Sequence, residues 1–371
     1  MYIIIERNFV FHALQNVLGF VGGVKSSSPI LGHILLEVRN NNLFMIGTNI
    51  DIEIVVYIPI YKIYDIGQIT VPAKKFFDIC RALSVTSKII LRYQESKLFI
   101  SSEGSSFSLV TFSPLDFPNM GVWDAEIEFT VSSNVLRNVI ELTQFSMGKR
   151  DVRYYLNGML FEFNMKNLCA VATDGHRLAY CSVLIVSTEV DINSSFSIIV
   201  PRKYVISMTR MLDVNEEKIK LKIGRQNISI VVGNYVVTSK LINGIFPNYK
   251  SVFPKESKFV LEVAVKKLQQ AIKRAMILCS EKFHVVRFLL GLNQLKIVSS
   301  NPEHELSEQL LDVVYSGRDM EIGFNIYYII DILNVIRSNT VRFLLTDEHS
   351  SVKIVSYPMD ISVYIIMPIR L

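Results

Sequence analysis

The chain of 371 residues lacks any long apolar run and contains only four cysteines. No stretch of about 18 consecutive uncharged apolar residues occurs, so we expect no membrane-spanning helix. The amino-terminal letters MYIIIERNF have no basic leader and too short an apolar run for a signal peptide. The cysteines are far apart and form no CxxC pair, which is typical of reduced thiols in a cytoplasmic protein: Cys80, Cys169, Cys181 and Cys279.

The signatures of common catalytic sites are also absent. The sequence contains no GxxxxGKS/T nucleotide-binding loop and no HExxH, GxSxG or GxGxxG signature. We therefore predict no catalytic site, no metal and no cofactor. No two histidines are four residues apart, and none has a cysteine at the spacing of metal ligands: His12, His33, His176, His284, His304 and His349.

One polar cluster, Thr173 to Arg177, allows two interpretations. Its letters are TDGHR, and it lies between two expected strands, NLCAVAT and RLAYCSV. In a metabolic α+β enzyme, Asp174 and His176 would supply an acid and a base. In a hairpin connection, Asp174-Gly175 is the preferred pair for a two-residue type I′ turn. The turn fits the pattern better, and the enzyme remains the alternative.

A short amphipathic segment occurs three times along the chain. The copies are VPAKKFFDICRAL at 71–83, VPRKYVISMTRML at 200–212 and FNIYYIIDILNVI at 324–336, which begin 129 and 124 residues apart. Pro72 and Pro201 are expected at the first helical position. Apolar residues recur every three or four positions in each copy, which predicts a helix with one buried face. Since other matches keep the same period, the segment marks a repeated domain.

The repeat extends beyond this helix and defines the fold class. FPN at 117–119 returns at 246–248, and NLFMIGT at 42–48 matches NLCAVAT at 167–173. Each copy is expected to have two helices and roughly eight strands, because apolar and polar residues alternate over many short runs. We predict an α+β fold in which each copy packs its two helices against antiparallel sheets. The three copies are expected at residues 1–126, 127–256 and 257–371.

Positive charge is concentrated in the expected helices. The whole chain has a net charge of +5. The six helices expected at 8–20, 73–83, 132–147, 201–212, 265–279 and 325–337 carry +9 together, so the remainder carries −4. A basic helix face can bind phosphates without reading bases, although an ordinary solvated face would show the same charges. The candidate phosphate contacts are Lys74, Arg81, Lys203, Arg210, Lys266 and Lys273.

Several motifs together resemble one known family. They are DVRYYLNGML at 151–160, ATDGHRLAY at 172–180, VPRK at 200–203, FPNY at 246–249 and MPIRL at 367–371. The chain resembles the bacterial DNA polymerase III beta subunits, the replicative sliding clamps, over its full length. The resemblance implies a non-enzymatic accessory subunit with three similar domains. It also implies a head-to-tail homodimer that closes a ring around duplex DNA without sequence specificity and tethers the polymerase.

The resemblance also implies residues for DNA contact and for the dimer interface. DNA contact is expected at Lys25, Arg150, Tyr154 and Tyr155. The chain departs from the family in its GGVKSSSP loop, which is one residue longer, and in Arg150, where glutamine is common. Both departures keep or raise the positive charge. The dimer interface is expected to join Phe107 and Leu109, in an edge strand of one subunit, to Ile277 and Leu278 of the other.

A pocket for partner peptides is the last feature that the resemblance implies. It would accept short peptides with glutamine followed by leucine and phenylalanine, carried by the replicative polymerase, the clamp loader, other polymerases and repair proteins. Methionine suits such a pocket because its side chain adapts to several partners. The expected lining is Leu156, Thr173, Gly175, His176, Arg177, Leu178, Pro247, Val252, Ser351, Ile365, Met367, Pro368, Ile369, Arg370 and Leu371.

Overall fold

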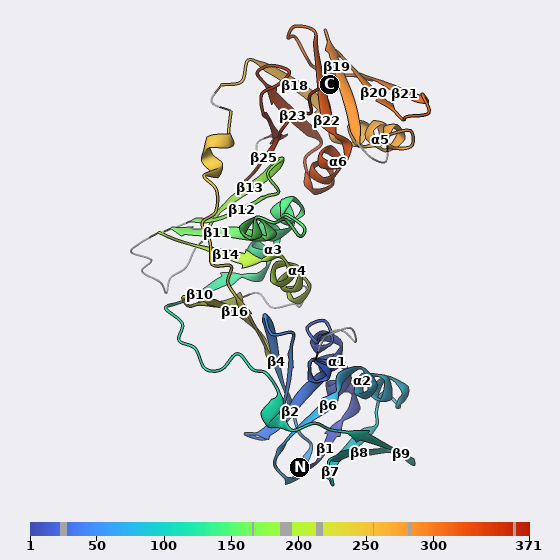
Figure 1. Ribbon diagram of the computed structural model, residues 1–371, viewed down its shortest axis with the longest axis vertical. Helices are drawn as coiled ribbons and strands as arrows, with labels where there is room; N and C mark the ends of the chain where they lie inside the picture. The colour runs from blue at the N-terminus through green and yellow to red at the C-terminus, as the bar shows by residue number, and fades with distance from the viewer. Residues whose placement is uncertain are drawn as a thin grey trace. The chain divides into compact units, whose positions relative to one another are not determined.

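The computed structural model describes residues 1–22, 28–164, 167–185, 195–212, 218–254, 256–280, 284–358 and 361–371. These residues form two compact units (Figure 1). The first unit contains Met1–Ser133 and Arg210–Leu241. The second contains Asn134–Thr209 and Ile242–Leu371. Lys25, one of the expected DNA contacts, lies outside the described residues.

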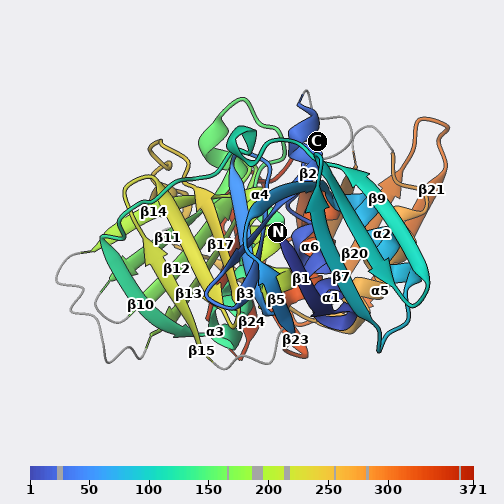
Figure 2. The same cartoon turned by 90° about the horizontal axis from the view of Figure 1, so that it is seen from below.

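The first unit has two antiparallel sheets. One has the strand order β5-β1-β7-β8-β9, and the other has the order β10-β15-β16-β17-β4-β3-β2-β6. Helices α1 and α2 lie on one face of the five-stranded sheet (Figure 2). The elements are β1 (Tyr2–Glu6), α1 (Arg7–Val17), β2 (His33–Arg39), β3 (Asn42–Thr48), β4 (Ile52–Pro59), β5 (Lys62–Asp65), β6 (Gln68–Pro72), α2 (Ala73–Ala82), β7 (Lys88–Gln94), β8 (Lys97–Ser102), β9 (Ser105–Val110), β10 (Ile127–Ser132), β15 (Lys218–Ile223), β16 (Asn227–Val232) and β17 (Tyr235–Lys240).

The second unit also has two antiparallel sheets. Their strand orders are β14-β11-β12-β13-β25-β24-β23-β18 and β21-β20-β19-β22. The elements are α3 (Ser133–Thr143), β11 (Gly158–Asn164), β12 (Asn167–Thr173), β13 (Arg177–Leu184), β14 (Phe196–Pro201), α4 (Arg202–Met211), β18 (Phe259–Ala264), α5 (Val265–Met276), β19 (Val285–Gly291), β20 (Gln294–Ser300), β21 (Leu306–Asp312), β22 (Met320–Asn325), α6 (Ile326–Val335), β23 (Thr340–Leu345), β24 (Val352–Tyr357) and β25 (Ser362–Ile366).

The sheets reveal how consecutive repeats are joined. Each eight-stranded sheet combines four strands of one repeat with four strands of the next. The junction is the antiparallel pair β17–β4 in the first unit and the pair β13–β25 in the second. In both junctions, the last strand of the later repeat pairs with an early strand of the repeat before it. Consecutive repeats therefore share continuous backbone hydrogen bonding.

The helices form where the apolar spacing predicts them. Phe76 and Cys80 of α2 are fully buried, one turn apart, while Lys74 and Arg81 are exposed. One detail of the prediction is wrong, because α2 and α4 each begin one residue after the proline. Pro72 has an extended backbone and is the residue that precedes the first helical turn. A proline fits this boundary because its fixed φ is compatible with the end of a strand.

A side chain of one helix caps the other helix of the pair in every repeat. Arg7 at the start of α1 donates to the carbonyl of Cys80 near the end of α2, at 2.6 Å. Arg202 at the start of α4 donates to the carbonyl of Met147 after α3, at 2.9 Å. Gln269 of α5 donates to Leu333 O of α6, at 2.8 Å. These bonds satisfy carbonyls that a helix end leaves unpaired, and they fix the helices against each other.

No helix of the described ranges is long and apolar enough to cross a membrane. All four cysteines are free thiols. Burial raises the pKa of the Cys80 thiol to about 12, so this side chain stays protonated and packs as a small apolar group.

His33 gives the fold of the first repeat a predictable acid sensitivity. Its ring stacks on Phe112 with centroids 4.4 Å apart and is only 7% exposed. Burial, and then the charge of Lys75, lower the pKa of His33 to about 4. A folded-state pKa below the unfolded value means that stability is complete above about pH 6.5 and is lost as the pH falls towards 4.

We expect the free energy of unfolding to fall by about 1–3 kcal/mol between pH 7 and pH 4 because of His33. Urea titrations of the unmodified chain and of His33→Phe at both pH values measure this loss, which should be smaller in the variant. His12→Phe is the matched control, because His12 is exposed on α1. An equal loss in all three proteins would contradict the role of His33.

Candidate functional site

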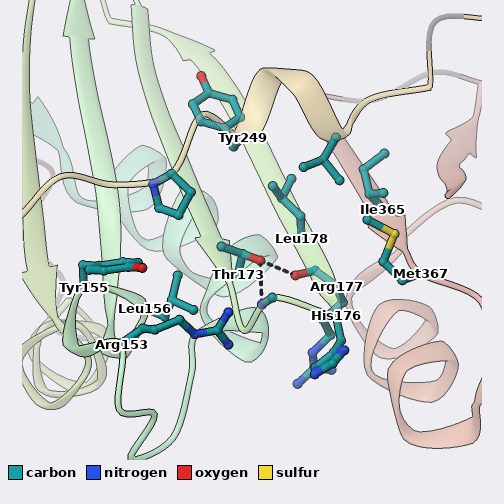
Figure 3. Close-up of a pocket in the computed structure, with 13 residues that line it drawn as sticks. Arg153, Tyr155, Leu156, Thr173, His176, Arg177, Leu178, Tyr249, Ile365 and Met367 are labelled. Carbon is teal, nitrogen blue, oxygen red and sulfur yellow. Dashed lines mark hydrogen bonds between the residues drawn. The ribbon is translucent and has the colours of Figure 1, made fainter.

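A cavity opens in the second unit where the β12–β13 hairpin meets strand β25 (Figure 3). Its volume is about 160 Å³. Because β13 pairs with β25, the two sides of the cavity come from different repeats but from one continuous sheet. The lining residues are Arg153, Tyr155, Leu156, Thr173, Gly175, His176, Arg177, Leu178, Pro247, Tyr249, Val252, Ile365 and Met367.

The floor of the cavity is apolar and rigidly placed. Leu178 and Ile365 lie directly opposite each other in the β13–β25 pair and are 3% and 1% exposed. Tyr249 and Val252 pack on the same cluster from the short helical turn Tyr249–Val252. Met367 remains 39% exposed at the open side. The site thus offers a preformed apolar surface with an adaptable side chain at its entrance.

The hairpin connection beside the cavity differs from the predicted two-residue turn. Thr173 pairs with Leu178, so four residues lie between the last paired positions. Asp174 Oδ1 accepts the backbone N–H groups of His176 and Arg177, at 3.0 and 3.1 Å. Only Gly175 has a positive φ, of +90°. The type I′ prediction is therefore wrong, because the Asp174 side chain organises a longer turn.

Arg177 is an anchor of the site. Its side chain is 9% exposed, and its guanidinium donates to Asp174 Oδ2 at 3.0 Å and to Asp331 Oδ2 at 2.6 Å. A third bond runs to the carbonyl of Phe145, at 2.7 Å, and the guanidinium lies 4.4 Å from the Tyr328 ring centroid. Since both Asp174 oxygens are engaged in this network, Asp174 holds the loop in shape. The arrangement does not favour the acid–base pair with His176.

Arg153 forms the polar rim opposite Arg177. Its guanidinium pairs with Asp151 at 2.9 and 3.0 Å, and this contact lowers the pKa of Asp151 to about 2. A Cβ at Gly175 would lie 2.9 Å from the Arg153 guanidinium. Gly175 therefore serves both the left-handed turn and the close approach of Arg153. The rim therefore places ion-paired guanidinium groups beside an apolar floor.

The carboxyl-terminal segment completes the cavity through two backbone hydrogen bonds. The Met367 N–H donates to His176 O at 2.9 Å, and the Ile369 N–H donates to Gly323 O at 2.8 Å. A Cβ at Gly323 would lie 2.7 Å from Ile369 O and 2.8 Å from a methyl group of Leu371. Only glycine allows this segment to lie so close to the edge strand β22. The docked segment sets the position of Met367.

The structure brings ten of the fifteen expected pocket residues around this cavity. Ser351 lies beside it and donates to Val252 O at 3.1 Å. Ile369, Arg370 and Leu371 line a different cavity of about 470 Å³. The five that do not line the site are Ser351, Pro368, Ile369, Arg370 and Leu371.

Three lining residues were not among those expected for the pocket. Tyr155 was expected to contact DNA, yet it lines the cavity. Arg153 and Tyr249 had no assigned role, although both belong to motifs used above, DVRYY and FPNY. The Tyr249 hydroxyl donates to Glu162 at 2.7 Å, and burial, followed by this bond, raises its pKa. Neither residue follows a periodic pattern, because both lie in irregular segments.

The basic helix residues share one spacing in three helices. Lys74 and Arg81, Lys203 and Arg210, and Lys266 and Lys273 are each seven residues apart, and all six are exposed. Seven residues are two helical turns, so each pair lies on one face about 10 Å apart. Arg81 also forms an ion pair with Asp78, at 3.0 Å. Of the other expected DNA contacts, Arg150 is exposed with a φ of +58°, and Tyr154 is 56% exposed.

The expected interface residues lie on the edge strand β9 and directly after helix α5. Phe107 and Leu109 belong to β9, which ends the five-stranded sheet, so the prediction of an edge strand is confirmed. Ile277 follows α5 and is 77% exposed, and Leu278 is half-buried. In the second unit, β21 is an edge of the four-stranded sheet.

Comparison with known proteins decides the family. Three domains of the DNA polymerase III beta subunit match the chain: the N-terminal domain at residues 1–121, the central domain at 130–248 and the C-terminal domain at 250–370. The chain belongs to the DNA polymerase III beta subunit family. The predicted family and the predicted α+β fold of three tandem clamp domains are therefore confirmed.

Individual relatives of this beta subunit agree over its whole length. The beta sliding clamp of Escherichia coli K12 is 45% identical over 99% of both chains. The solved structure of the Pseudomonas aeruginosa DNA polymerase III subunit beta has a TM-score of 0.96 and 37% identity, with all of both chains covered. Another structure of the Pseudomonas protein, with a TM-score of 0.94, is bound to griselimycin. The predicted function as a DNA sliding clamp, an accessory subunit of polymerase III, agrees with all of them.

The Gly323 contact in this clamp gives a direct prediction. Gly323→Ala should displace the segment from β22 and speed hydrogen exchange of the Ile369 amide about five- to tenfold, the effect of losing roughly 1 kcal/mol of local stability. Hydrogen–deuterium exchange with mass spectrometry measures this change. Gly291→Ala is the control, because its Cβ would have no neighbour closer than 3.7 Å. Unchanged exchange at Ile369 would refute the contact.

Proposed function

We propose that two copies of this chain join head to tail and close a ring around duplex DNA. The order of the strands carries this proposal. Within the chain, each repeat joins the next by pairing a late strand with an early strand, as in β17–β4 and β13–β25. By this rule, the late strand β9 and the early strand β21 each still lack a neighbour on one side. Pairing β9 with β21 of a second copy repeats the same junction, and doing so twice closes the ring.

The edge strands are suited to this pairing. β9 and β21 have six and seven residues, and both expose apolar side chains, such as Val110 and Leu310 at 64% and 63%. An exposed apolar edge is a site for pairing with another chain. Phe107 and Leu109 would then meet Ile277 and Leu278 of the second copy, as the resemblance implies.

The helices are the proposed contact with duplex DNA. None of the six α-helices of the described ranges has an acidic residue in its first turn. Three of them have lysine there instead, at Lys74, Lys203 and Lys266, although the helix dipole disfavours a cation at this end. Attraction to DNA phosphates would offset the unfavourable interaction of these lysines with the helix dipole. The binding free energy would then vary little with DNA sequence. Lys25, Arg150, Tyr154 and Tyr155 remain proposed contacts.

The cavity between β13 and β25 is the proposed docking site for partner peptides. Its apolar floor fits leucine and phenylalanine, and the carbonyls and guanidinium groups of the rim fit a glutamine amide. The polymerase catalytic subunit, the clamp loader, other polymerases and repair proteins would use it in turn. We assign no catalytic site or cofactor to the chain, place it in the cytoplasm, and keep the domain limits at 1–126, 127–256 and 257–371.

The ring should be retained on DNA by topology. Loaded by a clamp loader with ATP, the protein should stay on nicked circular DNA through gel filtration and leave once the circle is linearised. Ile277→Asp should abolish retention because it places a charge in the proposed interface, whereas Ile245→Asp should not, although Ile245 is 90% exposed. Retention that survives linearisation would contradict encirclement.

The pocket should depend on Met367. Met367→Ala should weaken binding of a fluorescent Gln-Leu-Phe peptide about five- to fiftyfold, since truncating a contact of this size costs roughly 1–2 kcal/mol. Fluorescence anisotropy measures the affinity, and sedimentation should show an intact dimer. Met120→Ala is the control, because Met120 lies in the first unit and does not line the cavity. Full affinity in Met367→Ala would disprove the assignment.

A further inference from the structure

The five-stranded sheet of the first unit has an open face that the proposed ring does not use. Helices α1 and α2 lie behind this sheet in the view of Figure 2. Ile3, Ile5, Ile89 and Leu91 point to the helix side and are fully buried. Their sequence neighbours alternate to the other face, as successive side chains of a strand do. This second face is the subject of the inference.

Aromatic rings and an arginine form a row across four strands of this face. Tyr64 of β5 stacks on Tyr2 of β1, with centroids 4.4 Å apart and planes 16° from parallel. Tyr2 lies opposite Arg92 of β7, whose guanidinium is 5.9 Å from the Tyr2 ring centroid. Arg92 lies opposite Phe99 of β8. We name these four residues the aromatic row.

Three of the four side chains of the row are exposed to solvent, and Tyr2 is half-buried. Tyr64 is 50% exposed and Phe99 36%. Tyr61, next to β5, is 59% exposed. Large aromatic side chains gathered on one open surface of a soluble protein mark a binding site more often than scattered ones do.

Basic side chains flank the aromatic row. Lys62 lies 4.7 Å from the Tyr64 ring centroid, and Lys88 lies 3.3 Å from that of Tyr61. Lys97 of β8, two residues before Phe99 and therefore on the same face of the strand, is also exposed. Of the acidic residues nearby, Asp65 accepts from the Met1 amino group at 3.0 Å, and Glu6 lies opposite Lys88 in the β1–β7 register. The face is therefore cationic as well as aromatic.

We propose that this face binds single-stranded nucleic acid. Bases of a single strand can stack on exposed aromatic rings, and its phosphates are attracted to neighbouring cations. An open antiparallel sheet with aromatic residues in a row across four of its strands is a geometry that suits this task. A base that stacks on Tyr64 takes the place of the Lys62 ammonium, which then pairs with the adjacent phosphate. A duplex keeps its bases stacked inside and offers the row nothing but phosphates.

The test uses the full-length protein and fluorescein-labelled strands of about 16 nucleotides, dT and U, in anisotropy titrations. Tyr64→Ala and Phe99→Ala should each weaken binding about fivefold or more, the effect of losing one stacked base. Lys97→Ala should lower the slope of log affinity against log salt by about 0.7. The dT and U arms show whether the sugar is read, and binding of either strand that depends on Tyr64 supports the proposal.

Controls separate this face from the rest of the protein. Tyr93→Ala should bind as the unmodified chain does, because Tyr93 is on the same strand as Arg92 but on the opposite face, 38% exposed. Lys240→Ala, an exposed lysine of β17, should leave the salt slope unchanged. Retention of Tyr64→Ala on circular duplex should also be unchanged, so failure here is distinct from failure of the ring.

Three results would overturn the proposal. One is equal affinity of the unmodified chain and both aromatic variants. Another is competition by unlabelled duplex as strong as by unlabelled single strand, which would mean that phosphates alone are bound. The last is displacement by poly-glutamate at equal charge concentration, which would identify a docking face for acidic proteins.

Discussion

Backbone pairing between strands of consecutive repeats is the constraint on which the structure depends. Five residue pairs join β17 to β4, from Tyr235–Val56 to Ser239–Ile52, and five join β13 to β25. Buried edge groups must find hydrogen-bond partners, and here each repeat finds them on its neighbour. The junctions are buried as well, since Val237 and Ile54 are at most 1% exposed. A repeat is therefore completed by the next one.

The candidate peptide site is a product of one such junction. Leu178 and Ile365 face each other across it, and the loops that end β12 and β25 rise around them. Arg177 then ties the hairpin loop to α6 through Asp331, 154 residues away in sequence. The site is apolar because it lies where buried side chains of two repeats meet across the β13–β25 pair. Charged side chains surround it because the two loops lie at the protein surface.

Local features of this chain could be predicted, and distant pairings could not. The helices follow from apolar spacing such as Phe76 with Ile79 and Leu83, and the three repeats follow from matching letters. No local pattern shows that β13 pairs with β25, because the hydrogen bonds involve only backbone. The prediction of a type I′ turn at Asp174-Gly175 is wrong because the Asp174 side chain accepts hydrogen bonds from two backbone amides. The position of Ile369–Leu371 depends on Gly323 because a glycine has no Cβ to block the close approach of this segment. The spacing of apolar residues in the sequence does not reveal such a contact.

The order of strands along the chain has a consequence for biosynthesis. β13 ends at Leu184 and β25 begins at Ser362, 178 positions later. Translation proceeds from the amino terminus, so β13 is made and exposed well before the ribosome has made its partner strand β25. During that interval the cavity is incomplete, and the bare edge of β13 is open to mispairing. A newly made chain would thus complete the proposed peptide site only at the end of its synthesis.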